Sequence, residues 1–204
     1  YPVIIDNMMN LELLTQAHKL GGPDSLLNVA VTHANTTMKN HFRPDYTTWH
    51  VVDYDPETGD VRMKQTAQGY SDDSAGGRGQ AWAVYGYTMM YREVGDEAYL
   101  AQAENIARMI MKHLPEDGVP YWDFNAPDIP DSYRDASAGA IIASAFIELA
   151  SHTKDAALSK ACMKTAEKQL RTLASDEYLA KPGRNGHFLL KHSMGSYPGN
   201  SEVD

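Results

Sequence analysis

Several side chains that can bind or react with a ligand stand where loops lead into regular structure: Asp6, His50, Gln68, Arg78 and Trp82. Together they supply a carboxylate, two neutral hydrogen-bonding groups, a cation and an aromatic ring. An arginine can bind a carboxylate through two hydrogen bonds, and an aromatic face packs well against a sugar ring. This mixture indicates a site for an acidic sugar.

Each of these residues also has a structural interpretation. Asp6 could cap a helix N-terminus, and Arg78 could belong to a surface ion pair. Trp82, one helical turn after Arg78, could be a core residue, and His50 could be a structural polar residue of a strand. Asp135 is predicted to cap the helix that follows it.

Other motifs are excluded by spacing. The segment 53–64 resembles a calcium loop, but its glycine is displaced and Lys64 stands where a glutamate is needed, so a hairpin turn is favoured. His33 and His41 lack the spacing of helical metal ligands, and no metal site is predicted. The sequence has no phosphate-binding loop and no nucleophile elbow. Cys162 is interpreted as a small core residue.

The composition is that of a globular chain, with 43% hydrophobic and 22% charged residues among 204. The net charge of −9 disfavours a nucleic-acid-binding surface and docking on an anionic membrane. No apolar run approaches the length of a bilayer span. A single cysteine excludes a disulfide within the chain.

Helical periodicity dominates the sequence and predicts six helices, at 7–20, 24–41, 78–93, 96–114, 135–151 and 155–173. They fall into three hairpins, because short turns alternate with long loops. The first long loop contains a predicted β-hairpin, 49–54 with 61–65. The long loops must then lie at one end of the helix array, together with the residues that could form a site.

Two neighbouring motifs carry a resemblance to a known family. The segment 68–74, Gln-Gly-Tyr-Ser-Asp-Asp-Ser, and the segment 78–82, Arg-Gly-Gln-Ala-Trp, resemble the unsaturated glucuronyl hydrolases of glycoside hydrolase family 88. The segment 2–11 is similar to the catalytic-aspartate segment of that family. Segments 41–45, 50–55 and 190–193 also fit, so the resemblance covers essentially the whole chain.

The resemblance implies an all-α fold, the (α/α)6 barrel of six helical hairpins. Residues 1–204 would be a single domain that covers about half of the barrel, its central portion, with a small β-hairpin insertion. The rest of the same barrel would be missing from the chain.

The resemblance also implies an activity, the release of a 4,5-unsaturated uronic acid from the non-reducing end of oligosaccharides left by polysaccharide lyases. The reaction is hydration of the C4=C5 double bond, with Asp6 as general acid and base. His50, Gln68, Arg78 and Trp82 match positions that line the sugar site. No metal and no organic cofactor are implied, and a bacterial periplasm or cytoplasm is the expected location.

The sequence departs from the family pattern in two places. A second important aspartate, far upstream of the position of Asp6, has no counterpart. Members that prefer sulfated substrates carry a Ser-x-x-Ser-x-Lys motif, of which only Ser196 fits, because Gly199 and Ser201 replace the other two residues. Three alternatives remain open: an unsaturated rhamnogalacturonyl hydrolase, a non-catalytic carbohydrate-binding or scaffold helical protein, and a sugar epimerase that uses His50.

Overall fold

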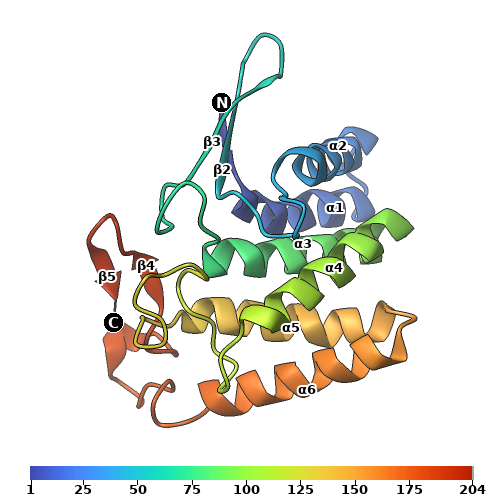
Figure 1. Cartoon of the computed structure of the whole chain (residues 1–204). Helices are drawn as coiled ribbons and strands as arrows, with labels where there is room; N and C mark the ends of the chain where they lie inside the picture. The colour runs from blue at the N-terminus through green and yellow to red at the C-terminus, as the bar shows by residue number, and fades with distance from the viewer. Residues whose placement is uncertain (204) are drawn as a thin grey trace.

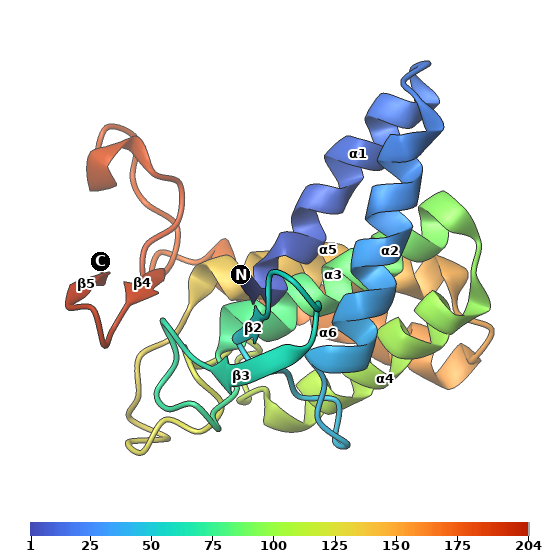
Figure 2. The same cartoon turned by 90° about the horizontal axis from the view of Figure 1, so that it is seen from above.

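The computed structural model describes residues 1–203, and within them six α-helices form three antiparallel hairpins (Figure 1). The helices are α1 (Leu11–Lys19), α2 (Asp24–Asn40), α3 (Gly77–Val94), α4 (Glu97–His113), α5 (Ala136–His152) and α6 (Ala156–Leu173). The short turns between paired helices lie at one end of the array, and the long loops lie at the other (Figures 1 and 2). The predicted number and pairing of helices are confirmed.

Local sequence explains where the helices begin and end. The side chains of Asp96, Asp135 and Asp155 accept backbone N–H groups in the first turns of α4, α5 and α6. These caps satisfy donors that a helix N-terminus leaves free. Gly95 ends α3 in a left-handed conformation, with φ of 76°, that costs little for a residue without a β-carbon. The prediction that Asp135 caps the fifth helix is confirmed.

The predicted helix over 7–20 is corrected in its first part. Residues before α1 form a 3-10 helix, η1 (Ile5–Asn10), which packs against α3. The contact is close, since a β-carbon on Gly86 would lie 2.5 Å from the β-carbon of Met8. Asp6 therefore lies inside η1, and its side chain caps no helix.

The predicted β-hairpin belongs to a three-stranded antiparallel sheet. Strand β2 (Val51–Tyr54) pairs with β3 (Val61–Gln65) on one side and with β1 (Pro2–Ile4) on the other. The sheet is fixed to α2 by His41, a buried residue whose Nε2 donates to the carbonyl of Val3 at 3.1 Å. Burial lowers the pKa of His41 to about 4, so this imidazole is neutral near pH 7. Strand β1 is followed directly by η1, which contains Asp6, so the position of the sheet also sets the position of Asp6.

The core lies between the helices, with α3 at its centre. Apolar side chains from η1, α3, α4 and α5 form one continuous buried cluster. After α6 the chain returns toward the long loops through a short 3-10 helix, η2 (Asn185–His187), and a small antiparallel pair, β4 (Met194–Ser196) and β5 (Ser201–Val203). Among residues 1–203, no helix combines the length and the apolar character that crossing a membrane requires.

Candidate functional site

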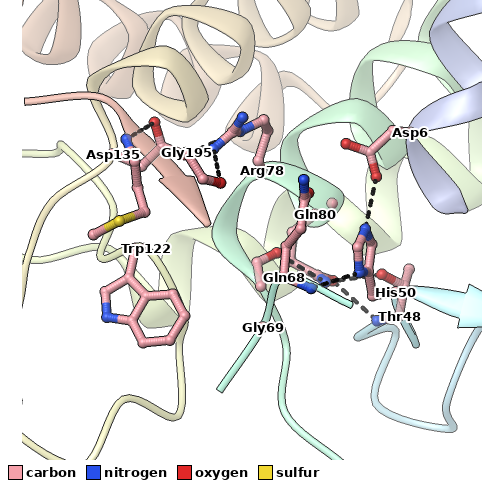
Figure 3. A pocket seen from close by; sticks show the side chains of 13 residues that line it. Asp6, Thr48, His50, Gln68, Gly69, Arg78, Gln80, Trp122, Asp135 and Gly195 are labelled. Atoms are coloured by element: carbon pink, nitrogen blue, oxygen red, sulfur yellow. Dashed lines mark hydrogen bonds and ion pairs between the residues drawn. The ribbon is translucent and has the colours of Figure 1, made fainter. Parts of the chain in front are cut away.

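A pocket opens at the long-loop end, where η1, the start of β2, and the first turns of α3 and α5 meet (Figure 3). Four residues predicted from the sequence line it: Asp6, His50, Gln68 and Arg78. They come from segments that are far apart in the chain, and the β-sheet and the helix starts bring them together.

Asp6 presents a nearly unpaired carboxyl group to this pocket. The residue is 9% exposed, and its Oδ2 accepts no hydrogen bond within residues 1–203. The basic group beside it is the imidazole of His50, whose Nε2 lies 3.7 Å from Oδ2. Burial raises the pKa of Asp6, although His50 and Arg78 act in the opposite direction. A carboxyl group in this environment retains its proton to a higher pH than an exposed aspartate.

The imidazole of His50 is held in one tautomer. Its Nδ1 receives the backbone N–H groups of Ala67 at 3.1 Å and Gln68 at 3.4 Å. Because Nδ1 accepts, the proton of the neutral ring lies on Nε2, the atom that faces Asp6. Burial lowers the pKa of His50, whereas the neighbouring Asp6 raises it. His50 is therefore a neutral donor toward the pocket.

A buried carboxylate shapes the loop that carries Gln68. Oδ2 of Asp123 accepts the backbone N–H of Tyr70 at 2.9 Å and the hydroxyl of Ser74 at 2.6 Å. Gly69 passes so close that a β-carbon there would lie 3.0 Å from the same oxygen. This packing holds Gln68 exposed at the rim of the pocket. Sequence reasoning missed Asp123, because its proline-rich loop gives no periodic signal.

Arg78 stands in the first turn of α3. Its Nε donates to Oδ2 of Asp135 at 3.2 Å, and its Nη2 donates to the carbonyl of Gly195 at 3.4 Å. The side chain is 31% exposed, whereas that of Asp135 is 1% exposed. In this ion pair Asp135 is buried, whereas Arg78 is partly exposed and lines the pocket.

Other residues of the pocket were not predicted as site residues, among them Gln80 and Trp122. Gln80 is fully buried; its Oε1 accepts the N–H of Thr48 at 3.0 Å and its Nε2 donates to the Thr48 hydroxyl at 2.8 Å. These bonds hold the chain two residues before His50. Trp122 is 5% exposed, and its Nε1 donates to Ser132 at 3.2 Å. Trp122 lies in the same proline-rich loop as Asp123, and nothing in the sequence ties it to the other site residues.

The structure does not bring Trp82 to this pocket. The helix begins at Gly77, so only its first turn reaches the lining, and Trp82 lies one turn further along. Its ring packs edge-on against Tyr85, with centroids 5.6 Å apart. The expectation that Trp82 contacts a sugar stays a prediction.

The remaining sequence interpretations concern residues outside the pocket. Cys162 is buried in the core, as predicted, and burial raises the pKa of its thiol to about 12. Residues 55–60 form the turn between β2 and β3, as predicted for the calcium-like segment. Among the described residues, no group of three histidine, cysteine, aspartate or glutamate side chains could hold a metal ion.

No protein-family model matches the chain, but curated proteins do. An unsaturated glucuronyl hydrolase of Formosa agariphila is 52% identical over 206 residues, which cover 100% of this chain and 50% of that protein. An unsaturated chondroitin disaccharide hydrolase of Streptococcus pneumoniae is 32% identical over 100% of this chain and 52% of its own length. The chain thus spans about half the length of the curated relatives it matches.

Solved structures give the same result. One described as an unsaturated glucuronyl hydrolase specific for heparin has a TM-score of 0.96 at 50% identity, over 100% of this chain and 55% of that one. The unsaturated glucuronyl hydrolase of Bacillus sp. GL1 has a TM-score of 0.90 at 33% identity, over 97% and 52%. The three helical hairpins therefore correspond to about half of an (α/α)6 barrel, and over its whole length the chain is similar to unsaturated glucuronyl hydrolases.

Proposed function

We propose that this protein is a glycoside hydrolase that releases a 4,5-unsaturated uronic acid from the non-reducing end of lyase-generated oligosaccharides. The observation that carries the proposal is Asp6, a buried carboxyl group with a raised pKa and a free oxygen in a pocket beside a cation. The names of the relatives support the same reaction class.

The reaction is hydration of the vinyl ether, and Asp6 serves it twice. Protonated Asp6 gives its proton to C4, which leaves positive charge at C5 and the ring oxygen. Water then adds at C5 and returns a proton to the Asp6 carboxylate. The resulting hemiketal rearranges, and the glycosidic bond opens. A single carboxyl group acts as acid and then as base, so the usual carboxylate pair of glycosidases is not needed.

The other pocket residues would bind and orient the sugar. Arg78 would bind the uronate carboxylate, and His50 would donate from Nε2 to a sugar oxygen or to the attacking water. Gln68 would form hydrogen bonds at the rim. Trp82 follows Arg78 by four residues and therefore faces the same side of α3, so we propose that it contacts a ligand that extends past the pocket. Residues 1–204 would form one domain, equivalent to the central portion of the relatives' barrel.

The alternatives have less support. An epimerase would need a histidine that accepts a proton from its substrate, but Nε2 of neutral His50 carries a proton and Nδ1 is occupied by backbone donors. No relative or structure described above is named as a scaffold or a rhamnogalacturonyl hydrolase. The relatives' names, which mention chondroitin and heparin, favour a substrate derived from a glycosaminoglycan.

The test is to mix the protein with unsaturated uronate disaccharides and to follow the absorbance of the enol-ether band. The proposal expects this absorbance to disappear with wild type and to persist with Asp6→Asn, which keeps the shape of the side chain and removes its titrating proton. Equal rates for the two proteins would refute the role of Asp6. Binding by calorimetry without turnover would favour the non-catalytic alternative, and a preference for pectin-derived over glycosaminoglycan-derived disaccharides would favour the rhamnogalacturonyl one.

A further inference from the structure

The two oxygens of Asp135 perform separate tasks. Oδ1 accepts the N–H groups of Ser137 at 3.0 Å and Ala138 at 3.4 Å, which caps α5, and it also accepts the N–H of Met194 at 3.4 Å. Oδ2 accepts from Nε of Arg78 at 3.2 Å. The cap of α5 uses only Oδ1, so the contact of Oδ2 with Arg78 is an additional function of the same side chain.

The contact between Asp135 and Arg78 is buried on the side of the aspartate, and it restricts the orientation of the guanidinium. The Asp135 side chain is 1% exposed, and it accepts hydrogen bonds from backbone N–H groups and from the Arg78 guanidinium. A guanidinium is planar, so a bond at Nε together with the bond from Nη2 to Gly195 fixes the plane of the whole group. Neither contact uses Nη1. Figure 3 shows Arg78 turned toward Asp135 and Gly195, on the side of the pocket opposite Asp6 and His50.

We propose that Asp135 is a positioning residue of the pocket, which holds the Arg78 guanidinium in the orientation that receives the carboxylate of an acidic sugar. The inference rests on the proposed function, because it assigns the uronate group to Arg78. It adds a residue that touches no substrate itself but decides how well Arg78 binds one.

The charge of Asp135 also reaches Asp6. The charged and titratable groups that act on Asp6 are His50 at the start of β2, Arg78 on α3 and Asp135 on α5. His50 and Arg78 lower the pKa of Asp6, whereas Asp135 raises it. Removing the negative charge at Asp135 should therefore lower the pKa of Asp6, an effect that a helix cap without this charge would not produce.

The chain contains a matched control at the start of α6. Oδ1 of Asp155 accepts the N–H groups of Ala157 at 3.0 Å and Leu158 at 3.1 Å, and Oδ2 accepts from Arg108 at 2.9 Å. In Asp155, as in Asp135, one oxygen caps a helix and the other accepts from an arginine, but Asp155 lies away from the pocket. Asparagine is as good a cap as aspartate, so Asp→Asn preserves the cap in both places while it weakens the arginine contact.

The experiment compares wild type, Asp135→Asn and Asp155→Asn with an unsaturated uronate disaccharide. We expect KM to rise about tenfold in Asp135→Asn with a smaller change in kcat, because a lost charged hydrogen bond misplaces a binding group. The alkaline limb of its pH–rate profile should move to lower pH. Asp155→Asn should keep the wild-type KM and profile. In a protein that already carries Arg78→Lys, Asp135→Asn should raise KM little further, because lysine has no Nε–H group that Asp135 could hold.

The outcomes separate this inference from the proposed function. If wild type turns over the disaccharide and Asp135→Asn behaves like Asp155→Asn, the inference is wrong and the function stands. If wild type shows no turnover, the proposed function is wrong, and calorimetric binding of glucuronate decides the inference. Weaker binding by Asp135→Asn than by wild type supports the inference. Equal binding by the two proteins, or no binding by wild type, overturns it. If Asp135→Asn fails to fold, Asp135→Ser, which keeps a capping oxygen, takes its place.

Discussion

The two sides of the pocket each contain a buried aspartate beside a basic residue, but the two pairs are built differently. On one side, Oδ2 of Asp6 lies 3.7 Å from His50 and accepts no hydrogen bond within residues 1–203. On the other side, both oxygens of Asp135 accept hydrogen bonds, one of them from Arg78. The exposed fractions are similar, 9% and 1%.

The difference shows that burial alone does not decide what a carboxyl group does. Burial without partners favours the neutral form, which suits Asp6 to the proposed role of proton donor. Asp135 is buried with several donors around it, and one of its oxygens accepts a hydrogen bond from the Arg78 guanidinium. Substitutions at the pocket should therefore separate the two carboxyl groups.

The largest effect is expected at Asp6. Asp6→Asn should reduce kcat on an unsaturated disaccharide on the order of 10³-fold, because the amide cannot give a proton to C4. The control is Asp24→Asn, at an aspartate whose side chain is 91% exposed at the start of α2, and it should retain the wild-type rate. A rate of Asp6→Asn within tenfold of wild type would remove the proposed acid.

The two aspartates should have opposite effects on stability. Asp135→Ala should lower the free energy of unfolding by about 3 kcal/mol, because it removes a helix cap and a charged hydrogen bond. Asp6→Asn should raise this free energy at neutral pH. The pKa of Asp6 in the folded state lies above its ordinary 3.8, so stability is lost as the pH rises through that range, and the asparagine avoids this loss.

Urea unfolding curves at pH 7 measure both changes. As a control, Asp155→Ala removes a cap and an exposed ion pair and should destabilise the protein less than Asp135→Ala. If Asp6→Asn and Asp135→Ala destabilised the protein to the same extent, the two carboxyl groups would have equivalent surroundings, and the contrast between them would be wrong.

The pH dependence of kcat should report the pKa of Asp6. The proposed reaction needs protonated Asp6, so the rate should fall as the pH rises through its raised pKa. Because Arg78 lowers this pKa, Arg78→Gln should move the alkaline limb to higher pH. This shift is opposite in sign to the one expected for Asp135→Asn. The remote variant Arg108→Gln should leave the limb in place, and shifts of equal sign at Arg78 and Asp135 would contradict the assignment.

The smallest effect is expected at Trp122, the aromatic residue of the pocket. Trp122→Phe removes part of the ring face and the bond to Ser132, and we expect KM to rise about threefold with kcat unchanged. Trp49→Phe serves as the comparison, because Trp49 lies between Arg43 and Lys64 and is not part of the lining. A large fall in kcat for Trp122→Phe would show that the ring contributes to the chemical step.

The sequence predicted those parts of the fold that depend on local signals. Gly95 and the caps at Asp96, Asp135 and Asp155 act within one helical turn, and the helices begin and end beside them. The β-hairpin followed from β-rich runs on both sides of a turn. Strand β1 was not predicted, because three residues carry too little pattern and only pairing with β2 makes them a strand.

The site was predicted in part for the same reason. Asp6, His50, Gln68 and Arg78 belong to segments whose motifs are recognisable, and the structure places all four in one pocket. Gln80 and Asp123 act through partners about 30 to 50 residues away, so nothing near them in the sequence shows their task. Trp82 lies one turn further along α3 than the lining residues, so its contact with a ligand stays a prediction.

The bond from Arg78 to Gly195 closes the pocket across 117 residues of chain, and the bond from Met194 to Asp135 spans 59. Long loops are costly to close before other contacts form, so this side of the pocket should assemble late in folding, after the helical hairpins. During synthesis, a nascent chain could not orient Arg78 until the segment around Gly195 had left the ribosome. The proposed site for an acidic sugar would then be complete only after the helices had already packed.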